Sequence, residues 1–153
     1  MEGYSHDNDD LKGILPRTME TIFNMILNAS EDNEYQIKVS MVEIYNEKVN
    51  DLLDSTKQNL QIKEDRLKGI FIQNLTEVYV GSAEHMLAIM KTGANNRTIA
   101  ATRMNENSSR SHSLFLVHVL QKNNKTESQK NSKLYFVDLA GSEKISKTTV
   151  TGQ

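Results

Sequence analysis

Two short segments of the chain carry groups that could hold a metal ion and a phosphate. In the later one, an apolar run at residues 134–137 ends at Asp138, and Gly141 follows three positions on. A carboxylate at a strand end can hold Mg²⁺ directly or through water, and a glycine amide can approach a phosphate oxygen with no side chain in the way. The earlier segment, residues 105–112, reads Asn-Glu-Asn-Ser-Ser-Arg-Ser-His. Its serine hydroxyls, at Ser108 and Ser109, suit a metal and a phosphate, and the guanidinium of Arg110 suits a carboxylate.

Each segment alone also has an ordinary explanation. Asp138 could simply cap a turn, and Gly141 could only supply a permissive backbone angle. Ser108 and Ser109 could be plain loop hydroxyls. The order of the two segments, the distance between them and the strand pattern before Asp138 favour a shared role in binding a nucleotide.

Taken together, the segments resemble the two nucleotide-sensing loops of the kinesin motor family. Residues 105–112 match switch I, Asn-x-x-Ser-Ser-Arg-Ser-His, and residues 138–143 match switch II, Asp-Leu-Ala-Gly-Ser-Glu. Residues 13–17 and 39–53 also resemble kinesin segments, and residues 144–148 continue as in conventional kinesin heavy chains. The resemblance therefore runs along the whole chain.

The resemblance implies a role for each residue of the two loops. Ser109 and Asp138 would hold Mg²⁺, Asp138 through water, while the Gly141 amide would sense the γ-phosphate. Ser108 would assist at that phosphate and at the attacking water. A salt bridge would close the loops over the nucleotide. The implied catalytic residues are Ser108, Ser109, Arg110, Gly141 and Glu143, of which Arg110 and Glu143 form the salt bridge; the implied nucleotide-binding residues are Asn105, Ser108, Ser109, Asp138 and Gly141.

Basic residues in two places are implied to contact tubulin. Lys144 and Lys147 follow switch II, where kinesins place basic residues against the acidic tubulin surface. Lys63, Arg66 and Lys68 lie in a segment that resembles the other tubulin-contacting loop. The alternative for both groups is a set of ordinary solvated side chains.

One motif of the family is missing from the sequence. No Gly-x-x-x-x-Gly-Lys-Ser/Thr occurs, although this P-loop grips the β- and γ-phosphates. We therefore expect residues 1–153 to be a single partial motor domain that lacks the P-loop and the C-terminal microtubule-binding helix. The 153-residue chain alone should be inactive, whereas the complete motor should be a microtubule-stimulated ATPase that uses ATP, ADP and Mg²⁺. The alternative is a noncatalytic tubulin- or partner-binding remnant.

Composition narrows the class of protein and of partner. The chain is 37% hydrophobic and 25% charged, has no Cys, and carries a net charge of −2. This charge argues against bulk attraction to nucleic acid, and no apolar run approaches the roughly 20 residues that cross a bilayer. The resemblance implies microtubules as partner, a cytoplasmic location on the cytoskeleton and a coiled coil outside this segment. It leaves open whether the full-length protein is a homodimer.

The loops must be positioned by a sheet and its helices. Apolar spacing predicts one helix near residues 15–28 and another after Ser82 that leads into the earlier loop. The alternating and apolar runs predict an α/β fold with a mixed central sheet and helices on both faces. The resemblance implies that this is part of the kinesin-type P-loop NTPase motor fold. Expected strands are residues 35–44, 70–72, 78–80, 114–120 and 134–139, the last two joined as a hairpin by residues 122–131; a helical turn is expected at residues 49–53.

Overall fold

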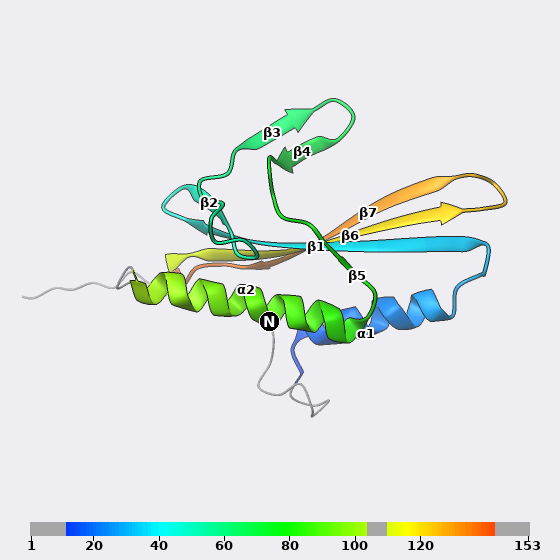
Figure 1. The fold of residues 1–153 in the computed structure, drawn as a ribbon, viewed down its shortest axis with the longest axis horizontal. Coiled ribbons are helices and arrows are strands. Elements are labelled where there is room, and N and C mark those ends of the chain that lie inside the picture. Colours follow the sequence, from blue (N-terminus) through cyan, green and yellow to red (C-terminus); the bar gives the residue numbers. More distant parts are fainter. Residues whose placement is uncertain (1–11, 104–109, 143–153) are drawn as a thin grey trace, which may run out of the picture.

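The computed structural model describes residues 12–103 and 110–142 of the chain. Two helices and seven strands follow one another in this part (Figure 1). In chain order they are α1 (Ile14–Leu27), β1 (Asn33–Tyr45), β2 (Lys48–Asp51), β3 (Ile62–Asp65), β4 (Gly69–Ile72), β5 (Val78–Val80), α2 (Ala83–Arg103), β6 (His112–Asn123) and β7 (Gln129–Asp138).

The main sheet is built around the long strand β1. Its strand order is β2-β1-β6-β7, and β5 pairs with another part of β1. The β1–β6 ladder runs from Asn33 opposite Asn123 to Ile44 opposite His112. Every ladder among the described residues is antiparallel. As a result, the start of β6 and the end of β7 lie at the same end of the sheet.

Both described helices cover one face of this sheet (Figure 1). Alternate β1 side chains point into that layer because successive strand residues face opposite sides. The helix α1 carries Pro16 in its first turn, where a proline costs no helical hydrogen bond. The Ser82 hydroxyl caps α2 by accepting the His85 N–H at 3.1 Å. The buried cluster of this face comprises Leu15, Met19, Ile37, Val39, Met41, Leu52, Val80, Met86, Met90, Phe115 and Val117.

The helix α2 lies very close to the sheet at Gly93. A Cβ atom placed there would overlap the Met41 Sδ atom and lie 3.5 Å from the Leu53 Cδ2 atom. The absence of a side chain is therefore what lets α2 approach β1.

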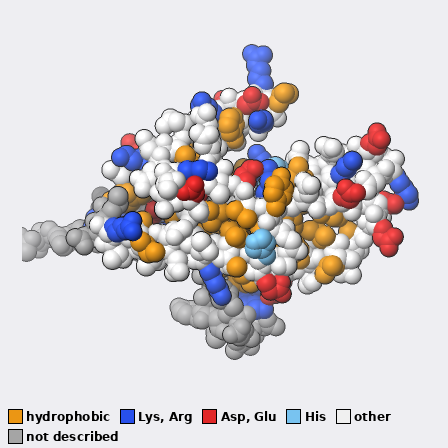
Figure 2. Space-filling model, viewed as in Figure 1, with side chains coloured by type: hydrophobic (Ala, Val, Ile, Leu, Met, Phe, Trp, Pro, Cys, Tyr) orange, Lys and Arg blue, Asp and Glu red, His pale blue; other side chains and the backbone are white. Residues whose placement is uncertain are grey.

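The opposite face of the sheet carries the β3–β4 hairpin. Residues 62–70 of this two-stranded unit are exposed, and the hairpin stands away from the sheet (Figure 1). Figure 2 shows basic, acidic and hydrophobic side chains mixed at its tip. The α/β class expected from the sequence is thus present. The described part contributes an antiparallel portion of the sheet and a single helical layer.

The helical turn expected at residues 49–53 is wrong. Residues 48–51 instead form β2, which pairs with β1 through the register Tyr45 to Lys48. The two residues between these strands, Asn46 and Glu47, have φ angles of 48° and 62°. Positive φ at both central positions makes the tight hairpin turn that matches the twist of the strands. The turn was missed because it contains no glycine.

The other expected strands are present, and several of them extend beyond the expected bounds. The strands expected at residues 70–72 and 78–80 are β4, which pairs with β3, and β5, which pairs with β1. The expected hairpin of β6 and β7 is confirmed, but its ladder extends to Lys122 opposite Gln129. The distal residues are polar and mostly exposed, so they lack the apolar alternation that indicates a strand.

Candidate functional site

The hairpin of β6 and β7 brings the ends of the two sequence motifs together. Its last ladder pair joins Ser113, three residues after Arg110, to Asp138. Asp138 and Gly141 are exposed, whereas Ser113 is buried. In Figure 1 this end of the sheet lies beside the C-terminal end of α2. A carboxylate and a glycine backbone are therefore presented at an open end of the sheet, next to the residues that follow Arg110.

A side chain continues the contact where the ladder ends. The Ala140 N–H donates a hydrogen bond to the His112 Nδ1 atom at 2.8 Å. The acceptor role of Nδ1 requires the neutral imidazole with its proton on Nε2. The bond joins the first residue of β6 to the residue immediately before Gly141.

A second polar contact anchors the residue before His112. On α2, the Arg97 Nη2 atom donates to the Ser111 Oγ at 2.9 Å and to the Ser111 carbonyl at 3.1 Å. The Arg97 Nε atom lies 3.3 Å from the same Oγ and 3.7 Å from the Glu43 Oε1 atom on β1. Ser111 is 2% exposed and Glu43 is 9% exposed. The guanidinium thus links α2, β1 and the end of the first motif inside the protein.

Several candidate residues lie outside the described part of the chain. They are Asn105, Ser108, Ser109, Glu143, Lys144 and Lys147. Arg110 is described and exposed. The salt bridge expected between Arg110 and Glu143 and the Mg²⁺ contact of Ser109 therefore stay predictions.

The carboxylate at the end of β7 suits Mg²⁺ in its chemistry. This ion usually keeps several waters and takes one or two protein ligands together with phosphate oxygens, so a dedicated cage of carboxylates is unnecessary. Among residues 12–103 and 110–142, no group of three His, Asp or Glu side chains could enclose a metal ion. The exposed Asp138 suits a Mg²⁺ site in which one or two protein ligands act together with water and phosphate oxygens.

Two predicted tubulin contacts, Arg66 and Lys68, occupy the turn of the β3–β4 hairpin. The Asp65 carboxylate accepts the Leu67 N–H at 2.8 Å and the Lys68 N–H at 2.9 Å. The hydrogen bond from the Lys68 amide, and then that from the Leu67 amide, hold the pKa of Asp65 below its usual value. The Lys68 Nζ atom lies 5.8 Å from the centre of the Phe71 ring. The turn is thus fixed locally, with both basic side chains exposed.

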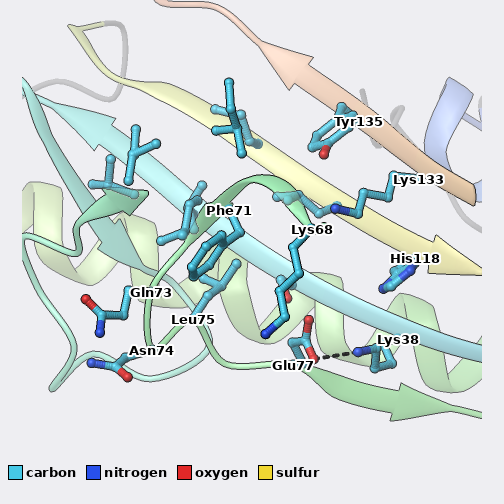
Figure 3. A pocket seen from close by; sticks show the side chains of 18 of the residues that line it. Lys38, Lys68, Phe71, Gln73, Asn74, Leu75, Glu77, His118, Lys133 and Tyr135 are labelled. Carbon is cyan, nitrogen blue, oxygen red and sulfur yellow. Dashed lines mark hydrogen bonds and ion pairs between the residues drawn. The ribbon is translucent and has the colours of Figure 1, made fainter. Parts of the chain in front are cut away.

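A groove of ≈ 970 Å³ lies between this hairpin and the open sheet face (Figure 3). Lys38 and Glu77 form an ion pair of 2.7 Å at one side of it. None of residues 110–112 or 138–141 lines the groove. It is therefore separate from the site at the end of β7.

The sequence interpretation missed Arg97, Glu43 and the position of His112. A signal for Arg97 was present, because Met86, Met90, Gly93 and Arg97 recur at helical spacing. The first three are buried, and Arg97 continues the same stripe. An arginine on the apolar face of a helix indicates a buried polar partner. The partner itself, Ser111, could not be named before the packing of α2 was known.

Comparison with known proteins matches residues 1–153 to the model of the kinesin motor domain. The chain belongs to the kinesin motor domain family. It is 50% identical over 154 residues to kinesin-related protein 3 of Dictyostelium discoideum, covering 99% of this chain and 13% of that protein. It is also 50% identical over 152 residues to human kinesin heavy chain isoform 5A, covering 99% of this chain and 15% of that protein.

A solved kinesin structure has the same fold. It was described as the structure of a fast kinesin, with implications for ATPase mechanism and interactions with microtubules. The match has a TM-score of 0.91 at 44% identity and covers all of this chain and 43% of the solved one. The kinesin segment described here thus spans under half of that solved chain and a smaller share of its curated relatives. No described helix is long and apolar enough to cross a membrane.

Proposed function

We propose that this kinesin segment supplies the two nucleotide-sensing loops of an ATP-driven microtubule motor. The observation that carries the proposal is the end of the β6–β7 hairpin. There Asp138 pairs with Ser113, and the His112 side chain contacts Ala140. The last residues of switch I and the first residues of switch II are therefore neighbours in space. A change in one loop can be transmitted to the other through this contact.

Within this proposal the residues of the chain have separate tasks. Ser109, and Asp138 through water, would hold Mg²⁺, which when bound would neutralise phosphate charge. The Gly141 N–H donates to a γ-phosphate oxygen, and Ser108 orients the attacking water. Arg110 pairs with Glu143 to close the loops. The P-loop that grips the other phosphates belongs to the proposed complete motor, of which this chain is one part.

The filament contact is proposed for basic residues on two segments. Lys144 and Lys147 follow switch II, so movement of that loop would alter their position against tubulin. Arg66 and Lys68 are exposed at the turn of the β3–β4 hairpin, which stands away from the sheet. Acidic tubulin surface would attract both pairs.

The test is Arg110→Ala in the complete motor, with Lys130→Ala as the control. Lys130 is an exposed basic residue at the distal end of the β6–β7 hairpin. Loss of the closing salt bridge should lower microtubule-stimulated kcat by roughly a hundredfold and leave affinity for a fluorescent ADP analogue nearly unchanged. The control should behave like the parent.

Two results would overturn parts of this proposal. Near-normal turnover by Arg110→Ala would remove the closing role of the salt bridge. If the parent motor binds microtubules but shows no stimulated ATPase, the noncatalytic tubulin-binding alternative becomes the better description.

A further inference from the structure

We propose that His112 is a positioning residue that fixes the phosphate-sensing amide of Gly141. The inference rests on the function proposed above and adds a residue that acts through Ala140. The evidence is the 2.8 Å hydrogen bond from the Ala140 N–H to His112 Nδ1.

The contact occurs where backbone pairing stops. The β6–β7 ladder ends with Ser113 opposite Asp138. Continued pairing would place the next residue of β7 opposite His112, but β7 ends at Asp138. Ala140 instead gives its amide proton to a side chain. The imidazole therefore replaces a ladder hydrogen bond at the point where the chain turns away from the sheet.

The imidazole projects from a firmly held backbone. His112 pairs with Ile44 of β1 as the last residue of the β1–β6 ladder. The preceding residue, Ser111, is 2% exposed and is bound through both its hydroxyl and its carbonyl by Arg97. Because the backbone is held at both Ser111 and His112, the His112 Nδ1 atom is an acceptor with a defined position. Such preorganisation is what a transition-state contact requires.

The consequence concerns hydrolysis more than nucleotide affinity. The N–H of Gly141 belongs to the peptide that follows Ala140, so fixing the Ala140 amide restricts the direction in which the Gly141 amide points. Without the bond, the γ-phosphate contact would form less often. Contacts of the base, the ribose and the other phosphates would be unaffected. We therefore expect a loss in kcat at constant affinity for ADP.

Three substitutions of His112 in the complete motor separate this role from simple packing. His112→Asn places an amide oxygen near the position of Nδ1, whereas His112→Gln places its amide group near the position of Nε2. His112→Phe keeps a ring and removes the acceptor. His85→Ala, at an exposed histidine of α2, is the control.

The expected results follow from the position of the acceptor. Loss of one net hydrogen bond should lower microtubule-stimulated kcat roughly three- to tenfold for the Gln and Phe variants. The Asn variant should stay within about twofold of the parent, and affinity for the fluorescent ADP analogue should not change in any variant. Equal kcat losses in Asn and Gln, or normal turnover in Gln and Phe, would overturn the positioning role.

A second measurement separates this inference from the proposed function. Amide hydrogen exchange at Ala140 should be slow in the parent and in His112→Asn and faster in His112→Gln and His112→Phe. If the parent lacks stimulated ATPase but keeps this pattern, the proposed function fails while the His112 contact stands. If exchange at Ala140 is the same in all variants, the contact itself is refuted.

Discussion

Arg97 and Ser111 form a forked contact that ties the helix α2 to the end of switch I. One guanidinium nitrogen reaches both the hydroxyl and the carbonyl of Ser111, at 2.9 and 3.1 Å. The nearby Glu43 carboxylate, 3.7 Å from the Nε atom, offsets the cation. Because Ser111 is buried, loss of the guanidinium would remove hydrogen bonds that water cannot readily replace.

The first prediction concerns this contact. Arg97→Lys keeps the charge but loses the planar fork, so it should lower the free energy of unfolding by about 1–3 kcal/mol. Ser111→Ala removes only the hydroxyl and should cost about 1 kcal/mol. Urea unfolding of the complete motor domain checks both values. Arg103→Lys, at an exposed arginine in the last turn of α2, is the control. Equal stability of Arg97→Lys and that control would contradict the role of the fork.

Sequence pattern was sufficient wherever one face of an element is buried. The spacing of Leu15, Met19 and Ile22 predicted α1, and the alternation at Ile37, Val39 and Met41 predicted β1. These periods arise because burial selects apolar residues on one side. Nothing similar marks β3, whose four residues are all exposed. Its formation depends on pairing with β4 and could not be read from its own residues.

The candidate site likewise contains residues that the sequence indicated and residues whose role depends on packing. Asp138, Gly141 and Arg110 were selected as candidates from their types and spacing, because each lies within a short motif that the sequence shows directly. Arg97 acts on Ser111 only because α2 packs across β1. Contacts between segments distant in sequence depend on packing geometry, which a single sequence states only indirectly.

The second prediction concerns the pH dependence of stability near His118. This side chain lies opposite Lys38 on β1 and Lys133 on β7, and among the described residues its buried Nε2 atom has no hydrogen-bond partner. Burial lowers the pKa of His118, and Lys38 and Lys133 lower it further, while Glu77 opposes them. The folded protein therefore binds this proton less readily than the unfolded chain.

The sign of the effect follows from that difference. The contribution of His118 to stability is complete above the unfolded pKa of about 6.5 and is lost as pH falls through the lower folded pKa. His118→Leu and His118→Gln cannot titrate, so both should flatten the decline in unfolding free energy between about pH 7.5 and about pH 5.5. The pKa values of Asp54 and Asp65 are lowered from 3.8 and fall outside this window. An unchanged decline in both variants would exclude His118 as its source.

The third prediction concerns the proposed filament contact. Reversing the charges of Lys144 and Lys147 to Glu in the complete motor should weaken microtubule affinity roughly tenfold at low ionic strength, and less in high salt, because ions screen the attraction. The control is Lys122→Glu with Lys130→Glu, the same change in net charge at the exposed distal end of the β6–β7 hairpin. Cosedimentation at two salt concentrations measures both. If the two double variants bind alike, net charge accounts for the effect and the local contact is wrong.

The β3–β4 hairpin should contribute less. Its tip combines the basic Arg66 and Lys68 with the acidic Glu64 and Asp65. Reversing Arg66 and Lys68 to Glu should therefore weaken binding by a smaller factor than reversing the pair after switch II. A larger loss at the hairpin would make it the main electrostatic contact.

The last prediction concerns the 153-residue chain produced alone. Among the described residues, β7 ends the path of the sheet, with Tyr135 54% exposed, Val137 45% exposed and Leu139, just beyond the strand, 70% exposed. An apolar edge strand can pair with another chain. We expect this protein to elute from size-exclusion chromatography as oligomers or aggregates.

A charge on that strand should oppose edge pairing, so Val137→Lys should shift the chain toward monomer. Ile99→Lys removes a comparably exposed apolar side chain, 50% exposed, from α2 and should leave the elution unchanged. The comparison distinguishes edge pairing from general hydrophobic association, which both substitutions would reduce alike. A parent chain that is monomeric and melts sharply and reversibly would show that the β7 edge is adequately protected without a neighbouring strand.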